Sequence, residues 1–249
     1  MLSKNRFINA VICLLPSPLA CIFLRFLGHE VGKSVRIGFS LLFVKQLHLK
    51  CNSKIGSGCI FNCEKIKLKN CAYIGRLNIF NGPFSLILCK DAGIGNGNKI
   101  TCGPKGMVTN GRSFLYLGKL SKITSDHRID LTRSVYLGDF TTIAGTRTEV
   151  WTHGYVHEPT GSGRYRIDGP VFLGSNVYIG SRALIMSGVK IETGIHVGAG
   201  AVISKSLSKP GIYVSQALRF LSIPSDPTLR SDLKLDETIK QDIVYTKKI

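Results

Sequence analysis

Residues 173–203 read LGSNVY-IGSRAL-IMSGVK-IETGIH-VGAGAV-I, and this stretch decides the fold of the chain. An aliphatic residue opens every group of six, and the fifth residue of each group is also apolar. A helix needs apolar positions about 3.6 residues apart and an isolated strand needs strict alternation, so neither fits. A period of six predicts short strands and turns wound into stacked coils. We expect both apolar positions to point inward and glycine or a small polar residue to occupy the turn.

The same period extends toward the N-terminus of the chain. It begins at Val31 and returns as an Ile-Gly or Leu-Gly pair at residues 37, 55, 74, 94, 117 and 137. These openers lie close to 18 or 20 residues apart, which predicts triangular coils of three sixes with small insertions at the corners. Because coils stack at the strand spacing of about 4.8 Å, about eight or nine of them would form a prism about 40 Å tall.

Three segments fall outside the repeat. Residues 152–169 are Gly-rich and polar, and we expect them to form a loop that protrudes from the β-helix of residues 31–208. Residues 209–249 are expected to form a closing segment followed by a short surface helix. Residues 1–30 are apolar but broken by Pro16 and Pro18, which argues against a transmembrane helix and favours two short amphipathic helices. These helices would cap the first coil or lie on the inner face of a membrane; a signal peptide is the alternative.

The chain is strongly basic. Its 33 Lys and Arg residues against 15 Asp and Glu residues give a formal charge of +18, which favours an anionic partner such as a phosphorylated cofactor or a membrane surface. It contains no zinc-finger spacing, aromatic stacking motif or basic run, so we expect no nucleic acid partner. None of the eight cysteines forms a CxxC pair, and we interpret them as mostly packed, reduced thiols of a cytoplasmic protein.

Residues 137–205 resemble the hexapeptide-repeat acyltransferases. The resemblance is carried by LGDFTTIAGTRTEVWTH before the loop and by GPVFLGSNVYIGS and VGAGAVISKSL after it, and it extends over about residues 31–221. It implies an all-β, left-handed parallel β-helix that assembles as a homotrimer with active sites between subunits. The similar branch of the family transfers acetyl groups from acetyl-CoA to sugar hydroxyls. The resemblance therefore implies an O-acetyltransferase of polysaccharide or glycan biosynthesis, with no metal.

The resemblance places a general base at His153, just before the loop. The chemistry also requires such a group, because a sugar hydroxyl is a poor nucleophile until a base takes its proton, and neutral imidazole suits pH 7. His157, Trp151 and His127 are the candidates for binding the acceptor. His153 could instead be a turn residue, His157 is its rival as the base, and His127 could be a polar corner residue. Either Glu149 or Glu158 is near enough in sequence to orient a histidine.

The resemblance also implies a set of residues that contact coenzyme A in the last coils. These are Ser181, Ala199, Ser204, Lys205 and Arg219. Lys205 and Arg219 would meet phosphate groups, although a solvated basic face is the alternative for both. The family commonly has Trp where Tyr178 stands, and its closing motif differs at residues 215–217.

Three other functions remain open from the sequence. An N-acetyltransferase acting on an amino sugar would use the same fold and the same donor. A non-catalytic solenoid that binds glycans or supports a membrane complex would need neither His153 nor the late-coil motif. A zinc-dependent hydratase would need three convergent histidines. His127, His153 and His157 are three, but the 26-residue step from His127 to His153 does not match whole coils.

Overall fold

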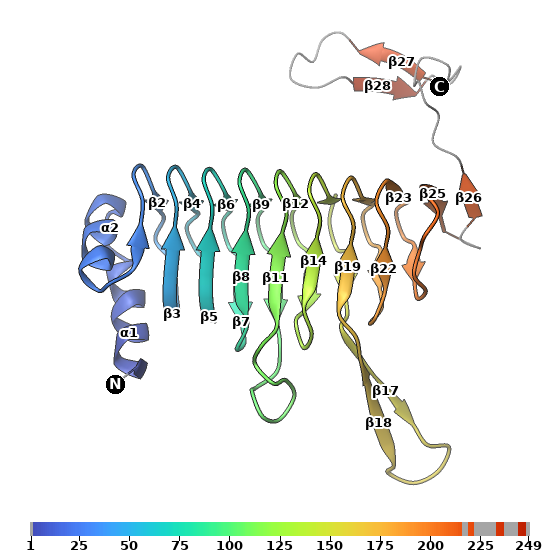
Figure 1. Cartoon of the computed structure of the whole chain (residues 1–249), viewed down its shortest axis with the longest axis horizontal. Coiled ribbons are helices and arrows are strands. Elements are labelled where there is room, and N and C mark those ends of the chain that lie inside the picture. Colours follow the sequence, from blue (N-terminus) through green and yellow to red (C-terminus); the bar gives the residue numbers. More distant parts are fainter. Residues whose placement is uncertain (1, 216–218, 222–232, 237–243, 248–249) are drawn as a thin grey trace.

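The computed structural model describes residues 2–215, 219–221, 233–236 and 244–247. Two helices, α1 (Leu2–Ile12) and α2 (Ser17–Phe26), stand at one end of a long solenoid of short strands (Figure 1). Almost all of the strands are parallel and each pairs with the equivalent strand of the next coil. The protein is a left-handed parallel β-helix with a helical N-terminal cap, as predicted from the sequence.

The first face of the solenoid is a sheet with one parallel strand from each of nine coils, which confirms the predicted number. Every strand continues the register of the one before it. In chain order the strands are β2 (Arg36–Ile37), β4 (Lys54–Ile55), β6 (Tyr73–Ile74), β9 (Gly93–Ile94), β12 (Lys122–Ile123), β15 (Thr142–Ile143), β20 (Tyr178–Ile179), β23 (Ile195–Val197) and β25 (Gly211–Val214).

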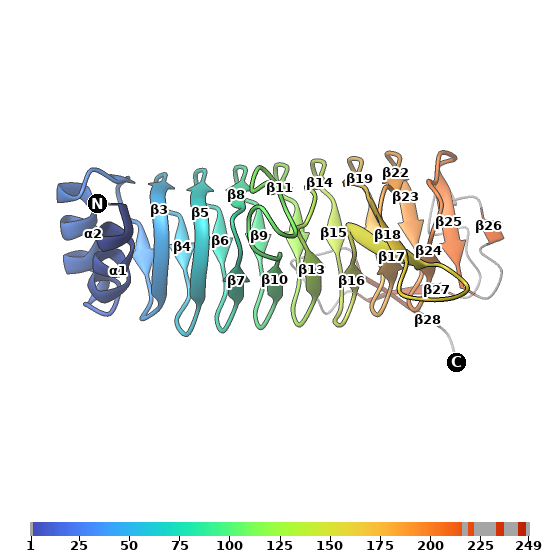
Figure 2. The same ribbon diagram turned by 90° about the horizontal axis from the view of Figure 1, so that it is seen from below.

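The other two faces belong to one continuous sheet. The second face contains β7 (Ile79–Asn81), β10 (Lys99–Thr101), β13 (Arg128–Asp130), β16 (Glu149–Val150), β21 (Leu184–Ile185) and β24 (Val202–Ile203) (Figure 2). The third face contains β8 (Ser85–Leu88), β11 (Phe114–Leu117), β14 (Val135–Leu137), β19 (Val171–Leu173) and β22 (Lys190–Ile191). In the first coils β3 (Leu41–Leu49) and β5 (Ile60–Leu68) run along both faces, and β1 (Glu30–Val31) pairs with the end of β3.

The core is a stack of aliphatic side chains in register. Behind the first face it consists of residues that are at most 3% exposed: Ile37, Ile55, Ile74, Ile94, Ile123, Ile143, Ile179 and Val197. A glycine follows six of these eight residues and allows the coils to approach closely, since a Cβ on Gly56 would lie 2.6 Å from the carbonyl carbon of Gly75. Some corners hold larger residues than predicted. Phe140 occupies a left-handed corner position with a φ of 57°. Its side chain is exposed and points away from the stack, so its size does not crowd the next coil.

Two coils are lengthened at the corner between the second and third faces (Figure 1). The partner of Ile94 on the next coil is Ile123, farther along the chain than in an ordinary coil, because residues 102–113 form an additional loop. The sequence analysis did not predict this loop. The partner of Ile143 is likewise the distant Ile179, because residues 152–169 leave the coil between them. These residues form an antiparallel ribbon of β17 (His153–His157) and β18 (Arg164–Asp168) rather than an irregular loop. Their aromatic and β-branched residues favour strands, which explains the difference.

The two ends of the solenoid differ. At the N-terminal end Cys13, Cys21 and Leu24 of the helical cap join the core. No helix in the described ranges has the length and apolar character that spanning a membrane requires. At the other end β25 extends the solenoid to Val214, beyond the predicted limit of residue 208, and β26 (Arg219–Leu221) pairs with it antiparallel.

The short helix predicted for the tail is wrong wherever the tail is described. Residues 233–236 and 244–247 form the antiparallel strands β27 (Leu233–Asp236) and β28 (Val244–Lys247). The sequence Leu-Lys-Leu-Asp alternates with a period of two, which is the pattern of a strand.

Candidate active site

His153 lies at the base of the ribbon, where the chain leaves the second face. Trp151 and Thr152 carry the chain round the corner from β16, and β17 begins at His153. The backbone is fixed on both sides, because His153 pairs with Asp168 and the amide of Gly169 donates to the carbonyl of Thr152 at 2.9 Å. The side chain of His153 is 21% exposed, so it can reach a ligand on the surface.

Asp130 holds the ring of His153 from the preceding coil. Nδ1 of His153 lies 2.8 Å from Oδ2 of Asp130. The pairing of Ile129 with Val150 brings Asp130 next to the corner from which His153 emerges. An ionised carboxylate only accepts hydrogen bonds, so the neutral imidazole carries its hydrogen on Nδ1 and leaves a lone pair on Nε2. Within the described residues Nε2 makes no hydrogen bond.

Two threonines hold the carboxylate of Asp130 in place. Thr152 donates to Oδ2 from its amide at 3.0 Å and from its hydroxyl at 2.5 Å. Thr132 donates to Oδ1 from its hydroxyl at 2.9 Å and from its amide at 3.2 Å. The backbone amide of Arg133 donates to the hydroxyl of Thr152, which fixes the direction of that hydroxyl. These bonds compensate the burial of Asp130, which is 9% exposed, and restrict the carboxylate to one orientation.

Aromatic side chains stand on either side of His153. The ring centroids of Trp151 and Tyr155 each lie 6.1 Å from that of His153, both in edge-on arrangements. Nε1 of Trp151 donates to Glu149 at 3.0 Å, so this glutamate orients Trp151 and not His153. Trp151 and Tyr155 are 39% and 46% exposed, and flat apolar surfaces of this kind suit the apolar faces of sugar rings.

A cleft of about 170 Å³ lies on the second face beside this group. Its polar lining includes Lys99, Thr101, Arg128 and Asp130, and Trp151 forms one wall. The structure therefore brings together Trp151, His153 and an acidic residue at one corner of the solenoid. This arrangement can bind a small polar molecule and take a proton from it.

His127 is not part of this group. It belongs to a corner ladder of buried polar residues, Asn78, Asn98, His127 and Thr148, in which each side chain of the first three accepts a hydrogen bond from the backbone amide of the next. Nδ1 of His127 accepts from Thr148 at 3.1 Å, so Nε2 carries the hydrogen and bonds to the hydroxyl of Thr124 at 2.9 Å. Burial lowers the pKa of His127 to about 4. Because His127 is only 1% exposed, it cannot make the predicted contact with the acceptor.

His157 lies at the outer end of β17, in register with Arg164. It is exposed, and it shares one side of the strand with His153 and Tyr155 because side chains alternate along a strand. The guanidinium of Arg164 lies 4.8 Å from the centre of the Tyr155 ring, a favourable contact between the two strands of the ribbon. The four residues from His153 to His157 place the two imidazoles well apart along the ribbon, so His157 is removed from Asp130.

The residues predicted to bind the donor lie at the two corners that border the second face. Ser181 and Ala199 are at the corner after the first face, where the amide of Gly200 donates to the carbonyl of Ser181 at 2.8 Å. Ser204 and Lys205 are exposed and follow β24 at the corner from which the ribbon emerges two coils earlier. The side chain of Arg219 lies outside the described side chains.

The described part of the chain contains no group of three His, Cys, Asp or Glu residues arranged to hold a metal ion. The three histidines required by the hydratase alternative are in different surroundings within this chain. His127 is enclosed in the corner ladder, His153 is bound to Asp130, and His157 is at the outer end of β17.

Asp130 is the residue that the sequence analysis missed. It lies in SDHRID, the segment in which His127 attracted attention, and 23 residues separate it from His153. The available signal was an acidic residue three positions after His127, on the coil before the ribbon. Glu149 and Glu158, which are closer in sequence to His153, do not make its hydrogen bond.

Residues 170–205 match the family model described as bacterial transferase hexapeptide (six repeats), so this part of the solenoid consists of hexapeptide repeats. This match confirms the resemblance predicted from the sequence. No curated protein sequence matches the chain.

A solved structure resembles the chain in fold, and others match it at lower TM-scores. The polysialic acid O-acetyltransferase OatWY has a TM-score of 0.53 and 14% identity, covering 78% of this chain and 87% of OatWY. The polySia-specific acetyltransferase NeuO has a TM-score of 0.43 and 16% identity, with coverages of 69% and 86%. A serine-to-alanine mutant of AntD, an N-acyltransferase from Bacillus cereus in complex with dTDP-4-amino-4,6-dideoxyglucose and coenzyme A, has a TM-score of 0.42 and 18% identity, with coverages of 84% and 91%.

Proposed function

We propose that the protein is an acetyl-CoA-dependent O-acetyltransferase that modifies a sugar hydroxyl, with His153 as the general base. The observation that supports this function is the pair of His153 and Asp130, 2.8 Å apart at the base of the ribbon. One ring nitrogen is anchored on a buried carboxylate, and the other keeps its lone pair for a substrate. A positioned imidazole of this kind is suited to proton transfer near pH 7.

In the proposed reaction, Nε2 of His153 accepts the proton of the sugar hydroxyl while the hydroxyl oxygen forms a bond to the thioester carbonyl carbon. The carbon–sulfur bond then breaks, and His153 returns the proton to the departing sulfur. Asp130 stabilises the imidazolium between these two steps and keeps the hydrogen on Nδ1 in the neutral ring. Trp151 would support the apolar face of the sugar. Neither a metal nor a covalent enzyme intermediate is required.

The donor site is proposed along the corners that border β21 and β24. Acetyl-CoA supplies an acyl group that is already activated as a thioester. At Gly200 a Cβ would meet nothing within 4 Å, so this corner is open enough for a narrow ligand. Lys205 is exposed two strand spacings, about 10 Å, beyond the corner of His153, where its charge would meet a phosphate group. We further propose that the protein assembles as a homotrimer, with each active site between neighbouring subunits.

The test is the release of free coenzyme A from acetyl-CoA over a panel of acceptors. Each sugar is offered as a hydroxyl compound and as the matched amino sugar, and the product bond is identified by mass spectrometry and by its lability to base. If the protein is an O-acetyltransferase, the wild type forms base-labile esters and the His153→Ala variant does not. Base-stable amides would identify an N-acetyltransferase. Glycan binding without release of coenzyme A would identify a non-catalytic solenoid.

A further inference from the structure

The strands of the second face follow one another from α1 to the candidate active site (Figure 2). They carry two rows of outward side chains in register. We call these rows the second-face strip. One row consists of Ile60, Ile79, Lys99, Arg128 and Glu149. The other consists of Phe43, Asn62, Asn81, Thr101 and Asp130. The strip is apolar near α1, cationic in the middle and ends at the carboxylate that holds His153.

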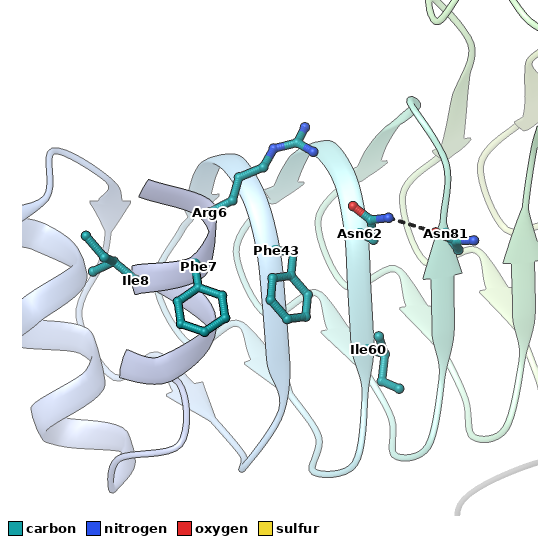
Figure 3. A pocket seen from close by; sticks show the side chains of 7 residues that line it. All are labelled: Arg6, Phe7, Ile8, Phe43, Ile60, Asn62 and Asn81. Atoms are coloured by element: carbon teal, nitrogen blue, oxygen red, sulfur yellow. Dashed lines mark hydrogen bonds between the residues drawn. The ribbon is translucent and has the colours of Figure 1, made fainter. Parts of the chain in front are cut away.

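A cavity of about 900 Å³ lies at the apolar end of the strip, beside α1 (Figure 3). Its lining consists of Arg6, Phe7, Ile8, Phe43, Ile60, Asn62 and Asn81. The rings of Phe7 and Phe43 lie 6.4 Å apart, yet Phe7 remains 65% exposed and Ile60 remains 41% exposed. A cavity of this volume with mostly apolar walls is suited to a hydrocarbon chain.

The helical cap extends this apolar surface. Caps of solenoids ordinarily have a polar outer face, because that face meets water. Here Val11 of α1 and Phe23 and Phe26 of α2 are all exposed, Phe26 at 83%. The end of the solenoid that bears the cavity is therefore suited to meet lipid. The guanidinium of Arg25 on α2 instead donates to the carbonyls of Val31 and Gly32 and fixes the cap on the first coil.

Two cations occupy the middle of the strip. Lys99 of β10 and Arg128 of β13 are exposed and directly opposite each other in register. Like charges in this arrangement repel and destabilise the sheet unless an anion lies between them. Neither cation forms an ion pair within the part of the chain that the structure describes. The carboxylate of Glu149, the next member of the row, is hydrogen bonded to Trp151. A phosphate group would neutralise both cations.

We propose that the acceptor is an amphiphile in which the sugar is joined through phosphate to a hydrocarbon chain. The hydrocarbon chain occupies the cavity beside α1, the phosphate lies on Lys99 and Arg128, and the sugar reaches His153. The three chemical parts follow the three parts of the strip in the same order. Four strand spacings, about 19 Å, separate β5 from β16, a distance that such a molecule spans. This inference rests on the proposed function, because it places the sugar at the proposed base.

The test uses farnesyl pyrophosphate as the probe, with inorganic pyrophosphate and farnesol as its two halves. Equilibrium dialysis of the full-length chain should give a Kd for farnesyl pyrophosphate at least tenfold lower than for either half. Joint replacement Ile60→Ser and Ile79→Ser should raise that Kd about tenfold, and Lys99→Ala should raise it and reduce its dependence on salt. Leu77→Asn is the matched control: Leu77 is exposed on the coil of Ile79, lies outside the cavity and has a left-handed φ that asparagine tolerates. It should leave the Kd unchanged.

Several results would overturn the inference. Equal binding of farnesol and farnesyl pyrophosphate would show that the strip is a general apolar surface without a phosphate site. Absence of binding would show that the strip does not bind such an amphiphile. Binding to phosphatidylglycerol vesicles that is insensitive to all of these replacements would indicate a membrane contact instead. Acetylation of free sugars that farnesyl pyrophosphate does not inhibit would sink the inference and leave the proposed function standing. Binding of farnesyl pyrophosphate as expected, without acetylation of any acceptor, would leave the amphiphile site and remove the proposed function.

Discussion

The corner ladder around His127 and the ribbon base around His153 place two histidines of successive coils in opposite situations. Both ring nitrogens of His127 are hydrogen bonded inside the protein, and its side chain is buried. His153 is bound through Nδ1 alone and is partly exposed. The difference teaches that the number of ring nitrogens already occupied, rather than proximity to the loop, separates a structural histidine from a candidate base.

The largest effect is expected at His153. His153→Ala should lower acetyl transfer by roughly 10²–10⁴-fold, the usual contribution of a positioned base. Thermal stability should hardly change, because the ring is partly exposed and outside the core. Initial rates and thermal unfolding of the same preparation check this, with His196→Ala, at an exposed histidine of the first face, as the control. Retention of most activity would break the contrast between the two corners.

The next largest effect is expected at Asp130, which acts through His153 as a positioning residue. In Asp130→Asn the side-chain amide can donate to Nδ1, which would move the hydrogen of the imidazole to Nε2 and mask the base. We expect kcat to fall roughly 10²-fold, an effect of the same kind as, but smaller than, the roughly 10⁴-fold loss when a triad aspartate is replaced by asparagine, with the KM for the acceptor nearly unchanged. Nitrogen NMR of labelled histidine reports the tautomer directly. An unchanged tautomer in an inactive variant would contradict this role.

A smaller effect is expected at His157. Because this residue is at the outer end of β17 and removed from Asp130, His157→Ala should raise the KM for the acceptor only about threefold and leave kcat unchanged, as expected when uniform binding is lost. Steady-state kinetics at saturating acetyl-CoA separates the two parameters. A collapse of kcat in this variant, with activity preserved in His153→Ala, would reverse the assignment of the base.

The smallest effect on activity, none at neutral pH, is expected for His127→Asn. Asparagine occupies the equivalent position of the ladder at Asn98 and can accept the same hydrogen bond from Thr148. In the wild type the pKa of His127 is lowered to about 4 from an unfolded value near 6.5. The unfolded chain therefore binds more protons in this range, so stability is fully present above pH 6.5 and is lost as the pH falls toward 4.

Urea unfolding at pH 7.5 and pH 5 measures this linkage. The wild type should lose more stability between the two values than His127→Asn does, and His196→Asn should behave like the wild type. Equal losses in the wild type and in His127→Asn would show that His127 does not titrate between folded and unfolded states as its burial requires.

The sequence alone was sufficient for the architecture. A period of six leaves one way to bury an aliphatic residue in every group, so the β-helix, its helical cap and the place where residues 152–169 leave the coil were all predictable. The family resemblance added the handedness and pointed to His153. The tail was mispredicted because its leucines and isoleucines also recur at helical spacing, which hid the strand alternation of Leu-Lys-Leu-Asp. Residues 102–113 were missed because an added loop leaves the flanking repeats intact.

The tertiary structure decided which residues meet. Successive coils are not equal in length: Ile55 follows its partner Ile37 by 18 residues, whereas Ile94 follows Ile74 by 20. A residue's neighbour on the next coil therefore cannot be counted along the chain, and so Asp130 could not be assigned to His153, nor Thr148 to His127. Inward side chains repeat with the coil and are visible in the sequence. The contacts between outward and corner side chains depend on the register of stacking, which only the folded solenoid defines.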